Sequence, residues 1–580
     1  MNTLTLEEEK IEKKETKRVS GSEALILSLI AENVKTAFGY PGGSIMPIYD
    51  KLMDFEDQLH HVLTRHEQGA IHAAQGYARV SGEAGVCLAT SGPGATNLIT
   101  GIADAFMDST PLVCITGQVY SNLLGSDAFQ ETDVLGVSMP VTKWNFQITK
   151  AEEIAPAIAK AFYIARAGRP GPVLIDITKD AMLEEVDYYY EKCSNIRSYI
   201  PIPETKENKI SQAVELIDHA KRPLAIVGQG VVLGHAEKEL LAFVEKTGIP
   251  VASTLLGLSA LPNKHKLYTG MVGMHGHAAP NIKTNEADLI IALGMRFDDR
   301  VTGKVTTYAP NAKKIHFEID KAEINKIIKV DVTVMGNVKD TLAKVTELVS
   351  PNAHKDWRNS FKYIDGKEEN RVIKKELYPE KGPITMGEVL RHLNDITKGE
   401  AVIVTDVGQH QMIASRYYQF KNKRSFITSG GLGTMGFGLP AAMGAQIGAP
   451  NREVVSISGD GGFQMTMQEL GTIAHNNVPL KMIVLNNNFL GMVRQWQEMF
   501  FDKRYASTEI TSPNFVLLAS SYGIDGERVS KRETLYQAVE KMMNSKKPFI
   551  LEVAVEAKGN VFPMIPAGSA VDELVYGDEE

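Results

Sequence analysis

The sequence predicts an α/β protein of three doubly wound parallel-sheet domains, of which the first and the last are related to each other. Apolar, β-branched runs alternate with segments of helical spacing, and at 580 residues the chain is too long for a single core. Several runs end in a glycine-rich turn that leads into a helix, which is typical of parallel crossover units. One such strand–turn–helix–strand unit lies near each end of the chain, with similar spacing, and this repeat predicts that the outer domains share a topology.

The composition is ordinary for a globular protein, with 43% hydrophobic and 23% charged residues. A formal net charge of −8, without a Lys/Arg cluster that interleaves aromatic residues, gives no sign of nucleic-acid binding. The long uncharged stretches 86–103 and 425–451 are interrupted by glycine, proline and hydroxyl residues, so we expect no membrane span. The three cysteines form no CxxC pair, and Cys87 and Cys114 lie in strand-like runs, which suits a reducing, cytoplasmic location.

The domain boundaries follow from changes in this pattern. Residues 1–18 mix Glu and Lys densely and contain no apolar segment, so we expect a charged, flexible tail without a targeting signal. Charge and proline are frequent at about 187–209 and 344–381, which predicts linkers there. The expected domains are therefore a first one at 19–186, a middle one at 210–343 and a last one at 385–555, followed by a C-terminal segment at 556–580.

The first domain is expected to begin with a helix capped near Ser20. Its strands are predicted within 36–43, 61–66, 86–91, 111–117 and 169–180. A strand is predicted to end before Glu67 and a helix to begin at it. A carboxylate in the first turn of a helix is favoured by the helix dipole, so Glu67 can have a purely structural role. This pattern alone therefore does not distinguish a structural from a catalytic role for Glu67.

The middle domain is predicted to be a Rossmann-like layer. Its strands lie within 223–230, 287–294 and 314–320, and they end in Gly-x-Gly, Gly or Asp. Gly228-x-Gly230 lacks the third glycine of the nucleotide-binding fingerprint, so it indicates a nucleotide only weakly.

The last domain carries the stretch that indicates chemistry. A strand at 453–458 leads through Gly459-Asp460-Gly461-Gly462 into a helix, and the next strand, from 479, ends at Asn487. Glycines at a helix N-terminus let the backbone approach a phosphate, and neighbouring parallel strands end at the same sheet edge. The oxygens of Asp460 and Asn487 would there suit Mg²⁺ beside a diphosphate. The alternative is a tight turn with Asp460 as an ordinary helix N-cap.

This Gly-Asp-Gly followed by Asn-Asn resembles the thiamine-diphosphate motif, and further stretches make the resemblance specific. They are Arg65 to Gln68, Ser126 to Thr132, Gly273 to Gly276, Arg296 to Lys304, Asp406 to Met412, Gly431 to Pro440 and Asn487 to Trp496. From about Val19 to the C-terminus the chain resembles the catalytic subunits of the acetohydroxyacid synthase (acetolactate synthase) family. The resemblance implies a decarboxylating condensation of pyruvate with a second 2-ketoacid, pyruvate or 2-ketobutyrate, early in branched-chain amino acid biosynthesis.

The same resemblance implies the residues around thiamine diphosphate. Glu67 would face N1′ of the aminopyrimidine, where a partly desolvated carboxyl group can share a proton with the ring. Met435 would enforce the bent cofactor shape, unless it only fills the core. The other implied cofactor contacts are Gly408, Gln409, His410, Gly459, Asp460, Gly461, Gly462, Asn487 and Met492. The Mg²⁺ ligands would be Asp460, Asn487 and the carbonyl of Phe489, where many relatives have histidine.

A structural FAD and a substrate channel are implied as well. The FAD-contacting positions would be Arg169, His275, Arg296, Asp298 and Asp320. Gly294 and Met274 are further implied cofactor contacts, and Met274 would also line the substrate channel. The substrate residues would be Phe129, Gln130, Lys179, Arg300 and Trp496, of which Gln130 and Lys179 are also assigned to catalysis. Trp496 resembles the tryptophan that selects 2-ketobutyrate, and its alternative is a core aromatic.

Other functions remain as alternatives at this point. A catabolic acetolactate synthase without FAD, or a pyruvate oxidase or decarboxylase, shares the cofactor, but the stretch 296–304 and Trp496 match the biosynthetic branch. A nucleotide-binding regulatory protein would leave Glu67, Asp460 and Asn487 unexplained together. The resemblance further implies a homodimer or a dimer of dimers with active sites between chains, and it allows for a small regulatory subunit.

Overall fold

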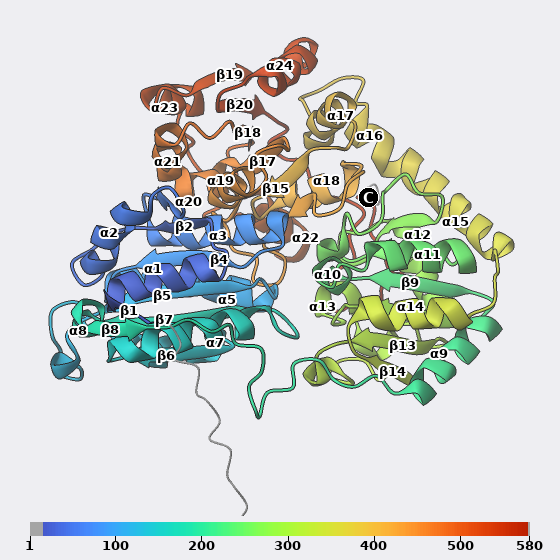
Figure 1. Cartoon of the computed structure of the whole chain (residues 1–580). Helices are drawn as coiled ribbons and strands as arrows, with labels where there is room; N and C mark the ends of the chain where they lie inside the picture. The colour runs from blue at the N-terminus through green and yellow to red at the C-terminus, as the bar shows by residue number, and fades with distance from the viewer. Residues whose placement is uncertain (1–15, 578–580) are drawn as a thin grey trace, which may run out of the picture.

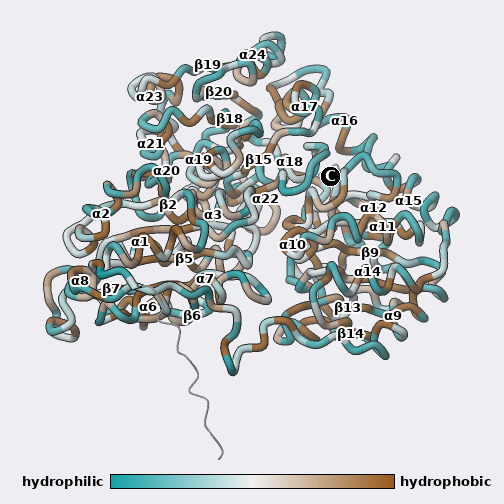
Figure 2. The backbone as a smooth tube through the Cα atoms, in the orientation of Figure 1, coloured by the Kyte–Doolittle hydropathy of each residue, from teal (hydrophilic) through white to brown (hydrophobic). Residues whose placement is uncertain are grey.

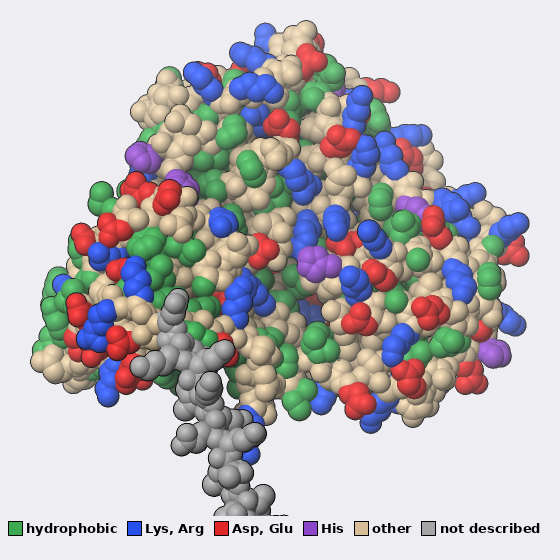
Figure 3. Space-filling model, viewed as in Figure 1, with side chains coloured by type: hydrophobic (Ala, Val, Ile, Leu, Met, Phe, Trp, Pro, Cys, Tyr) green, Lys and Arg blue, Asp and Glu red, His purple; other side chains and the backbone are tan. Residues whose placement is uncertain are grey.

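The computed structural model describes residues 16–577 and contains three six-stranded parallel sheets, each covered by helices (Figure 1). Three doubly wound α/β domains are thus confirmed. Hydrophobic segments run through the interior of each domain (Figure 2). On the face shown in Figure 3, acidic and basic side chains are interspersed, so that face carries no uniform charge. Within residues 16–577, no helix combines the length and apolarity needed to cross a bilayer.

The first domain has the strand order β3-β2-β4-β5-β7-β6. Its strands are β2 (Thr36–Gly39), β3 (His60–Leu63), β4 (Gly85–Ala89), β5 (Leu112–Gln118), β6 (Trp144–Ile148) and β7 (Pro172–Thr178). Its helices are α1 (Gly21–Ala31), α2 (Met46–Leu52), α3 (Glu67–Ser81), α4 (Pro93–Asn97), α5 (Ile99–Met107), α6 (Val134–Ser138), α7 (Ile154–Arg166) and α8 (Lys179–Leu183). The Ser20 side chain caps α1 by accepting a hydrogen bond from the Glu23 amide, as expected.

The last domain has the order β16-β15-β17-β18-β20-β19. Its strands are β15 (Val402–Thr405), β16 (Phe426–Ile427), β17 (Val454–Gly459), β18 (Lys481–Asn486), β19 (Asp525–Val529) and β20 (Phe549–Ala554). Its helices are α17 (Met386–Thr397), α18 (Gln409–Tyr417), α19 (Gly438–Gly448), α20 (Asp460–Thr466), α21 (Leu470–His475), α22 (Gly491–Phe500), α23 (Phe515–Ser521) and α24 (Arg532–Asn544). In both outer sheets the second strand along the chain lies at one edge and the fifth at the other, so their topologies agree.

The middle domain has the order β11-β10-β9-β12-β13-β14. This order places the first strand beside the fourth, as in the Rossmann fold. Its strands are β9 (Pro223–Val227), β10 (Val251–Ser253), β11 (Tyr268–Met271), β12 (Leu289–Leu293), β13 (Lys313–Glu318) and β14 (Val332–Met335). Its helices are α9 (Glu207–His219), α10 (Gln229–Leu233), α11 (Glu237–Thr247), α12 (Ala278–Glu286), α13 (Asp299–Thr302) and α14 (Val338–Leu348).

The first and last domains pack through α3 and α19, whose facing positions carry small residues. A Cβ on Gly76 would overlap the Ala441 carbonyl, and one on Gly444 would overlap the Ala73 carbonyl. The two helix backbones therefore touch directly, which only glycine allows. One hydrophobic cluster consequently runs through both domains.

Two of the segments expected to be a linker and a tail contain regular secondary structure. The predicted linker at 344–381 is mostly helical, with α15 (Lys355–Glu368), a π-helical turn (Glu369–Ile373) and α16 (Lys374–Leu377). Trp357, Phe361 and Ile364 are buried on one face of α15 at helical spacing, and the many charges on its other face obscured that pattern. In the expected tail, the last residues form β1 (Lys17–Ser20), which pairs with β8 (Glu185–Tyr188). Residues 1–15 of that expected tail lie outside the described part of the chain.

The C-terminal segment extends from the last domain onto the middle domain (Figure 1). The Ile565 amide donates to the Met274 carbonyl at 2.8 Å, and the Lys304 amide donates to the Ser569 carbonyl at 2.9 Å. Ile565 and Val571 are buried in the middle domain's core. The segment therefore fastens the loops that carry Met274 and Arg300.

Candidate functional site

Asp460 and Asn487 both lie at the C-terminal ends of neighbouring strands, on the same edge of the sheet, as predicted. Strands β17 and β18 are parallel neighbours, and Asp460 directly follows β17 while Asn487 directly follows β18. Their exposed fractions are only 1% and 4%. Asp460 Oδ2 accepts a hydrogen bond from Ser512 Oγ at 2.8 Å. The edge therefore presents a buried carboxylate and a buried amide, which is a hard-oxygen donor set.

Asp460 is not the N-cap of α20, because that position belongs to Gly459 and no side chain caps the helix. The tight-turn alternative thus lacks its expected hydrogen bond. Burial raises the pKa of Asp460, while the Ser512 hydroxyl opposes this shift. A buried carboxylate of this kind is stabilised by a cation, so the site fits a metal ion held beside a phosphate.

His410 supplies the second part of the edge. Strand β15 is the other neighbour of β17. It ends at Thr405, and α18 begins at Gln409 with Gly408 as its N-cap. The imidazole is buried and packs on Gly459, where a Cβ would lie 3.0 Å from His410 Nδ1. Burial lowers its pKa to about 4, and Nε2 has no hydrogen-bond partner. A helix N-terminus beside an unpartnered imidazole nitrogen fits an anionic group such as a diphosphate.

Gln409 and Met492 tie this region to neighbouring elements. Gln409 Nε2 donates to Gln495 Oε1 at 3.1 Å and to the Gly559 carbonyl at 2.9 Å. These contacts join the start of α18 to α22 and to the C-terminal segment. Met492, on α22, packs against the hydrophobic core of the last domain.

Met435 faces the Asp460 turn. It is half-buried and lies outside the hydrophobic clusters, so the core-filler alternative has no support. A Cβ built on Gly461 would lie 3.9 Å from Met435 Cε. Asp406 holds the backbone after Met435, because its carboxylate accepts from the Gly436 amide at 3.0 Å. The sequence analysis included Asp406 in a motif but did not predict a role for it. Its position directly after strand β15, at the edge that carries Asp460, could have indicated one.

Glu67 lies in the first domain, at the first position of α3. It is 8% exposed, and Asn97 Nδ2 donates to Glu67 Oε2 at 3.0 Å. The helix N-cap is His66, so Glu67 is not needed for capping. Nearby Thr90 Oγ1 is buried without a partner. The turn before Glu67 is held by the last domain of the same chain, since Glu469 accepts from the Arg65 amide at 3.1 Å.

The predicted substrate residues divide between two places. Phe129, Gln130 and Lys179 belong to the first domain: Phe129 is 88% exposed, Gln130 packs on Gly92, and Lys179 Nζ donates to the Gly43 carbonyl at 3.1 Å. They lie around the glycine turns that follow β2 and β4. The described contacts of Glu67 likewise stay in the first domain, whereas those of Asp460 stay in the last.

Arg300 and Trp496 lie outside the first domain. Arg300 is exposed on α13, with Nη1 at 3.9 Å from Met274 Sδ. Trp496 lies on α22 and is partly exposed, its ring 5.3 Å from that of Phe500. The core-aromatic alternative for Trp496 is therefore not supported. The described contacts of Arg300 and Trp496, with Met274 and Phe500, do not include Lys179.

The predicted FAD residues are only partly free to bind a ligand. His275 is buried, its pKa is lowered by burial to about 3, and Nε2 has no partner, which fits a ligand nearby. Arg169 instead pairs with Asp320 at 3.2 Å and joins the first domain to the middle one. Asp298 caps α13 by accepting from the Arg300 amide at 3.0 Å.

Gly294 and Arg296, two further predicted cofactor contacts, follow strand β12. Gly294, directly after β12, packs against Gly230. Arg296 approaches the first and last domains, because a Cβ on Gly431 would lie 2.9 Å from both Arg296 Nη2 and Asp108 Oδ1. These contacts place the predicted FAD positions along the junction of the three domains.

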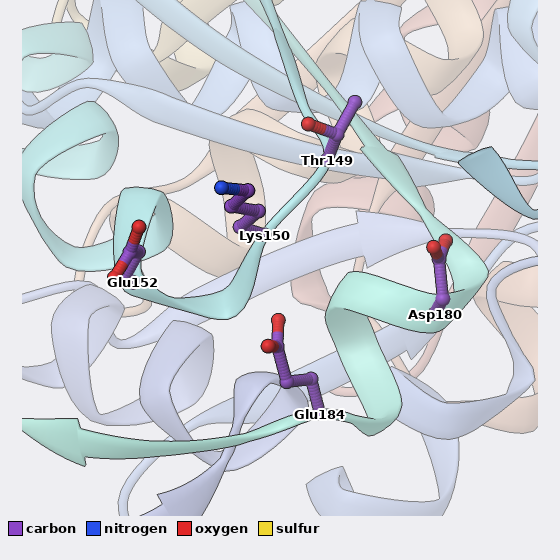
Figure 4. A pocket seen from close by; sticks show the side chains of 5 residues that line it. All are labelled: Thr149, Lys150, Glu152, Asp180 and Glu184. Atoms are coloured by element: carbon purple, nitrogen blue, oxygen red, sulfur yellow. The ribbon is translucent and has the colours of Figure 1, made fainter.

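A hollow of about 460 Å³ in the first domain contains none of the predicted site residues. Figure 4 shows its lining side chains, which come from α8 and from the loop after β6, namely Thr149, Lys150, Glu152, Asp180 and Glu184. Asp180 accepts from the Ser121 amide at 2.9 Å, and Glu184 accepts from the Ala151 amide at 2.9 Å. These two carboxylates thus hold loops in place.

Comparison with known families and proteins identifies the same three units. Residues 19–137 match the thiamine pyrophosphate enzyme N-terminal TPP binding domain, 210–345 match the central domain, and 406–553 match the C-terminal TPP binding domain. The acetolactate synthase large subunit of Corynebacterium glutamicum is 45% identical, over 96% of this chain and 90% of that protein. The acetolactate synthase isozyme 2 large subunit of Escherichia coli is 44% identical, over 96% and 99%. A probable acetolactate synthase large subunit of Methanocaldococcus jannaschii is 43% identical, over 96% and 95%.

Proposed function

Because this chain belongs to the acetolactate synthase large subunits, a family of thiamine pyrophosphate enzymes, we infer that it condenses pyruvate with a second 2-ketoacid and releases carbon dioxide. The reaction is an early step of branched-chain amino acid biosynthesis. The observation that carries the inference is the sheet edge that combines Asp460, Asn487 and the unpartnered His410 nitrogen. The relatives named above are acetolactate synthases, so the oxidase and decarboxylase alternatives gain no support.

The residues at this edge fit the cofactor of the family. Thiamine diphosphate, when bound, supplies the electron sink for decarboxylation. Asp460, Asn487 and the Phe489 carbonyl would hold Mg²⁺, and the start of α18 with His410 would hold the diphosphate. The half-buried Met435 side chain, which faces the same turn, would support the bent cofactor. The unpartnered His410 nitrogen and the buried Asp460 carboxylate are what favour this arrangement.

Glu67 would share its proton with N1′ of the aminopyrimidine. Its near-complete burial and its hydrogen bond from Asn97 favour this role, because they hold the carboxyl group in one orientation. Asn97 would orient the carboxyl group. The unpartnered Thr90 hydroxyl beside it offers a further polar contact.

The 2-ketoacids would lie between the two groups of substrate residues. Arg300 would bind a carboxylate, Gln130 and Lys179 would line the channel and take part in catalysis, and Trp496 would meet the alkyl end of the second ketoacid. Since the described hydrogen bond of Glu67 stays in the first domain and that of Asp460 stays in the last, we propose that a site forms between two chains of a dimer or of a dimer of dimers. A structural FAD at the domain junction and a small regulatory subunit also belong to this proposal, the latter because the relatives are named large subunits.

The test is the purified protein supplied with pyruvate, thiamine diphosphate and Mg²⁺. We expect acetolactate to form, activity to disappear with a chelator and return with Mg²⁺, and a flavin absorption spectrum to accompany the protein. Acetaldehyde or peroxide as the main product would indicate a decarboxylase or an oxidase instead. Activity without flavin would remove FAD from the proposal and leave the rest intact.

A further inference from the structure

The loop 428–436, here called the Met435 loop, connects β16 to α19, and a carboxylate of the first domain binds its first half. Asp108 accepts hydrogen bonds from the Gly430 amide at 2.8 Å and from the Gly431 amide at 2.7 Å. It is also paired with Arg79, whose Nη2 donates to Asp108 Oδ2 at 2.8 Å. Arg79 in turn donates from Nη1 to the carbonyl of Thr428 at 2.5 Å.

A second carboxylate of the first domain binds the point at which the loop closes on itself. Asp104 Oδ1 accepts from Thr434 Oγ1 at 2.9 Å and from the Ser429 hydroxyl. Ser429 Oγ also accepts from the Thr434 amide at 2.8 Å, so the two ends of the loop are tied together there. One side chain thus fixes both ends of the turn.

Met435 lies between two anchored positions. The residue before it, Thr434, is held by Asp104 of the first domain. The residue after it, Gly436, is held by Asp406 of the last domain, with an amide–carboxylate distance of 3.0 Å. The direction of Met435 toward the Asp460 turn is therefore set from both sides.

Two buried carboxylates are a costly way to join the two domains. Asp104 and Asp108 lie one helical turn apart, are 0% and 1% exposed, and carry like charges. Asp108 is the C-cap of α5, where the helix dipole disfavours an acid. Asp104 Oδ2 has no partner, and burial and the nearby Asp108 raise the pKa of Asp104 to about 6. Apolar side chains would join the domains at less cost in desolvation.

We propose that Asp104 and Asp108 are positioning residues, which fix Met435 against the Asp460 turn so that cofactor activation depends on the packing of the first domain against the last. The proposal rests on the proposed function, because Met435 acts there as the support of the bent cofactor. In this proposal the two carboxylates act through the Met435 loop, to which their described hydrogen bonds lead.

The test compares Asp104→Ala and Asp108→Ala with the conservative Asp104→Asn, whose amide oxygen can still accept from Ser429 and Thr434. Glu32→Gln is the matched control, since Glu32 is a buried first-domain carboxylate that pairs with Arg166 at 2.8 Å, away from the loop. Amide hydrogen exchange of segment 428–436 is measured on the full-length protein without cofactors. The exchange rate of the C2 proton of bound thiamine diphosphate and its dissociation constant are measured on the loaded protein.

We expect both alanine variants to lose amide protection in the loop and to slow C2-proton exchange roughly 10- to 100-fold, as for a group displaced by about 1 Å. Asp104→Asn and Glu32→Gln should retain C2-proton exchange close to wild type. Unchanged C2-proton exchange in alanine variants whose loop has lost protection would overturn the inference. That result would leave the proposed function standing, which fails only if wild-type protein forms no acetolactate.

If an alanine variant does not fold, the same measurements are made on Ser429→Ala and Thr434→Val. These substitutions remove the loop hydroxyl groups that bind Asp104 and leave Asp104 itself unchanged. Slowed C2-proton exchange in these variants, with α5 intact, supports the proposal. Wild-type C2-proton exchange in both contradicts it.

Discussion

At the scale of single residues, three of the buried polar atoms without a partner lie at predicted cofactor positions or beside Glu67. His410 Nε2, Thr90 Oγ1 and His275 Nε2 are each buried and unpaired among the described residues. Leaving such an atom unsatisfied costs about 1–3 kcal/mol, so each position favours a ligand that completes the hydrogen bond. Two of these atoms, on His410 and His275, belong to residues that the sequence motifs had already singled out.

Glu67→Gln should slow C2-proton exchange in bound thiamine diphosphate and reduce turnover on the order of 10²–10⁴-fold, because an amide cannot share the proton of N1′. The Asn97 hydrogen bond can persist, so the fold should not change. The measurement is C2-proton exchange alongside acetolactate formation. Glu32→Gln serves as the control for a buried glutamate, and an unchanged exchange rate in Glu67→Gln would return Glu67 to a structural role.

Trp496→Leu should reduce the preference for 2-ketobutyrate over pyruvate as the second substrate. The two ketoacids differ by one methylene, which a large apolar surface can discriminate by roughly 1–3 kcal/mol. A competition assay with both acceptors measures the product ratio, and acetolactate formation from pyruvate alone should persist. Phe501→Leu is a suitable control, because Phe501 lies beyond α22 and is 61% exposed. Equal product ratios in wild type and Trp496→Leu would exclude the proposed contact.

At the scale of elements, the predicted diphosphate and metal site is formed by residues that follow the C-terminal ends of strands. β15, β17 and β18 are consecutive neighbours in one parallel sheet, so Gly408, Asp460 and Asn487 are brought to one edge although they are distant in the chain. Strand pairing fixes this edge, and buried side chains on both faces of the sheet fix the register. The position of Met435 is different, since it depends on a loop that is anchored by α5.

Asp460→Ala should abolish retention of Mg²⁺ and thiamine diphosphate while the fold is kept. The carboxylate is buried but caps no helix, and its one described side-chain partner, Ser512, can remain solvated without it. The measurements are cofactor affinity by calorimetry and the thermal midpoint of the protein without cofactors. Asp525→Ala on β19 is the control from the same domain; normal cofactor affinity in Asp460→Ala would contradict the metal site.

At the scale of the whole molecule, α3 and α19 make the first and last domains one packed body, with the middle domain beside it (Figure 1). Even so, the described contacts of Glu67 and Asp460 remain in separate domains. The C-terminal segment crosses to the middle domain and holds the loops of Met274 and Arg300. These features favour an active site that a second chain completes.

Mixing Glu67→Ala with Asp460→Ala should therefore restore activity. Each variant alone lacks one half of every site, whereas a mixed dimer contains one intact site. The two inactive proteins are unfolded and refolded together, and acetolactate formation is compared with that of each protein refolded alone. Sedimentation provides the second measurement, since a fully active monomer would rule out a shared site.

The sequence alone determined the fold class, the related outer domains and the edge that carries Asp460 and Asn487. These depend on local information: hydrophobic periodicity shows strands and helices, and glycine turns show where a strand enters a helix. The helical segment 355–377 was not predicted, because the many charged residues on its outer face suggested a linker. Trp357, Phe361 and Ile364, which are buried at helical spacing, were the evidence for a helix. The motif resemblance then supplied roles for residues that periodicity could not distinguish.

Only the tertiary structure decided which side chains support the site. Asp104 and Ser429 are 325 positions apart, and the sequence contains no pattern that pairs them. Glu469 reaches the turn before Glu67 in the same way, across 404 positions to Arg65. The physical reason is that a hydrogen bond depends on distance in space, whereas the periodicity of a sequence records only which face of its own element a residue occupies.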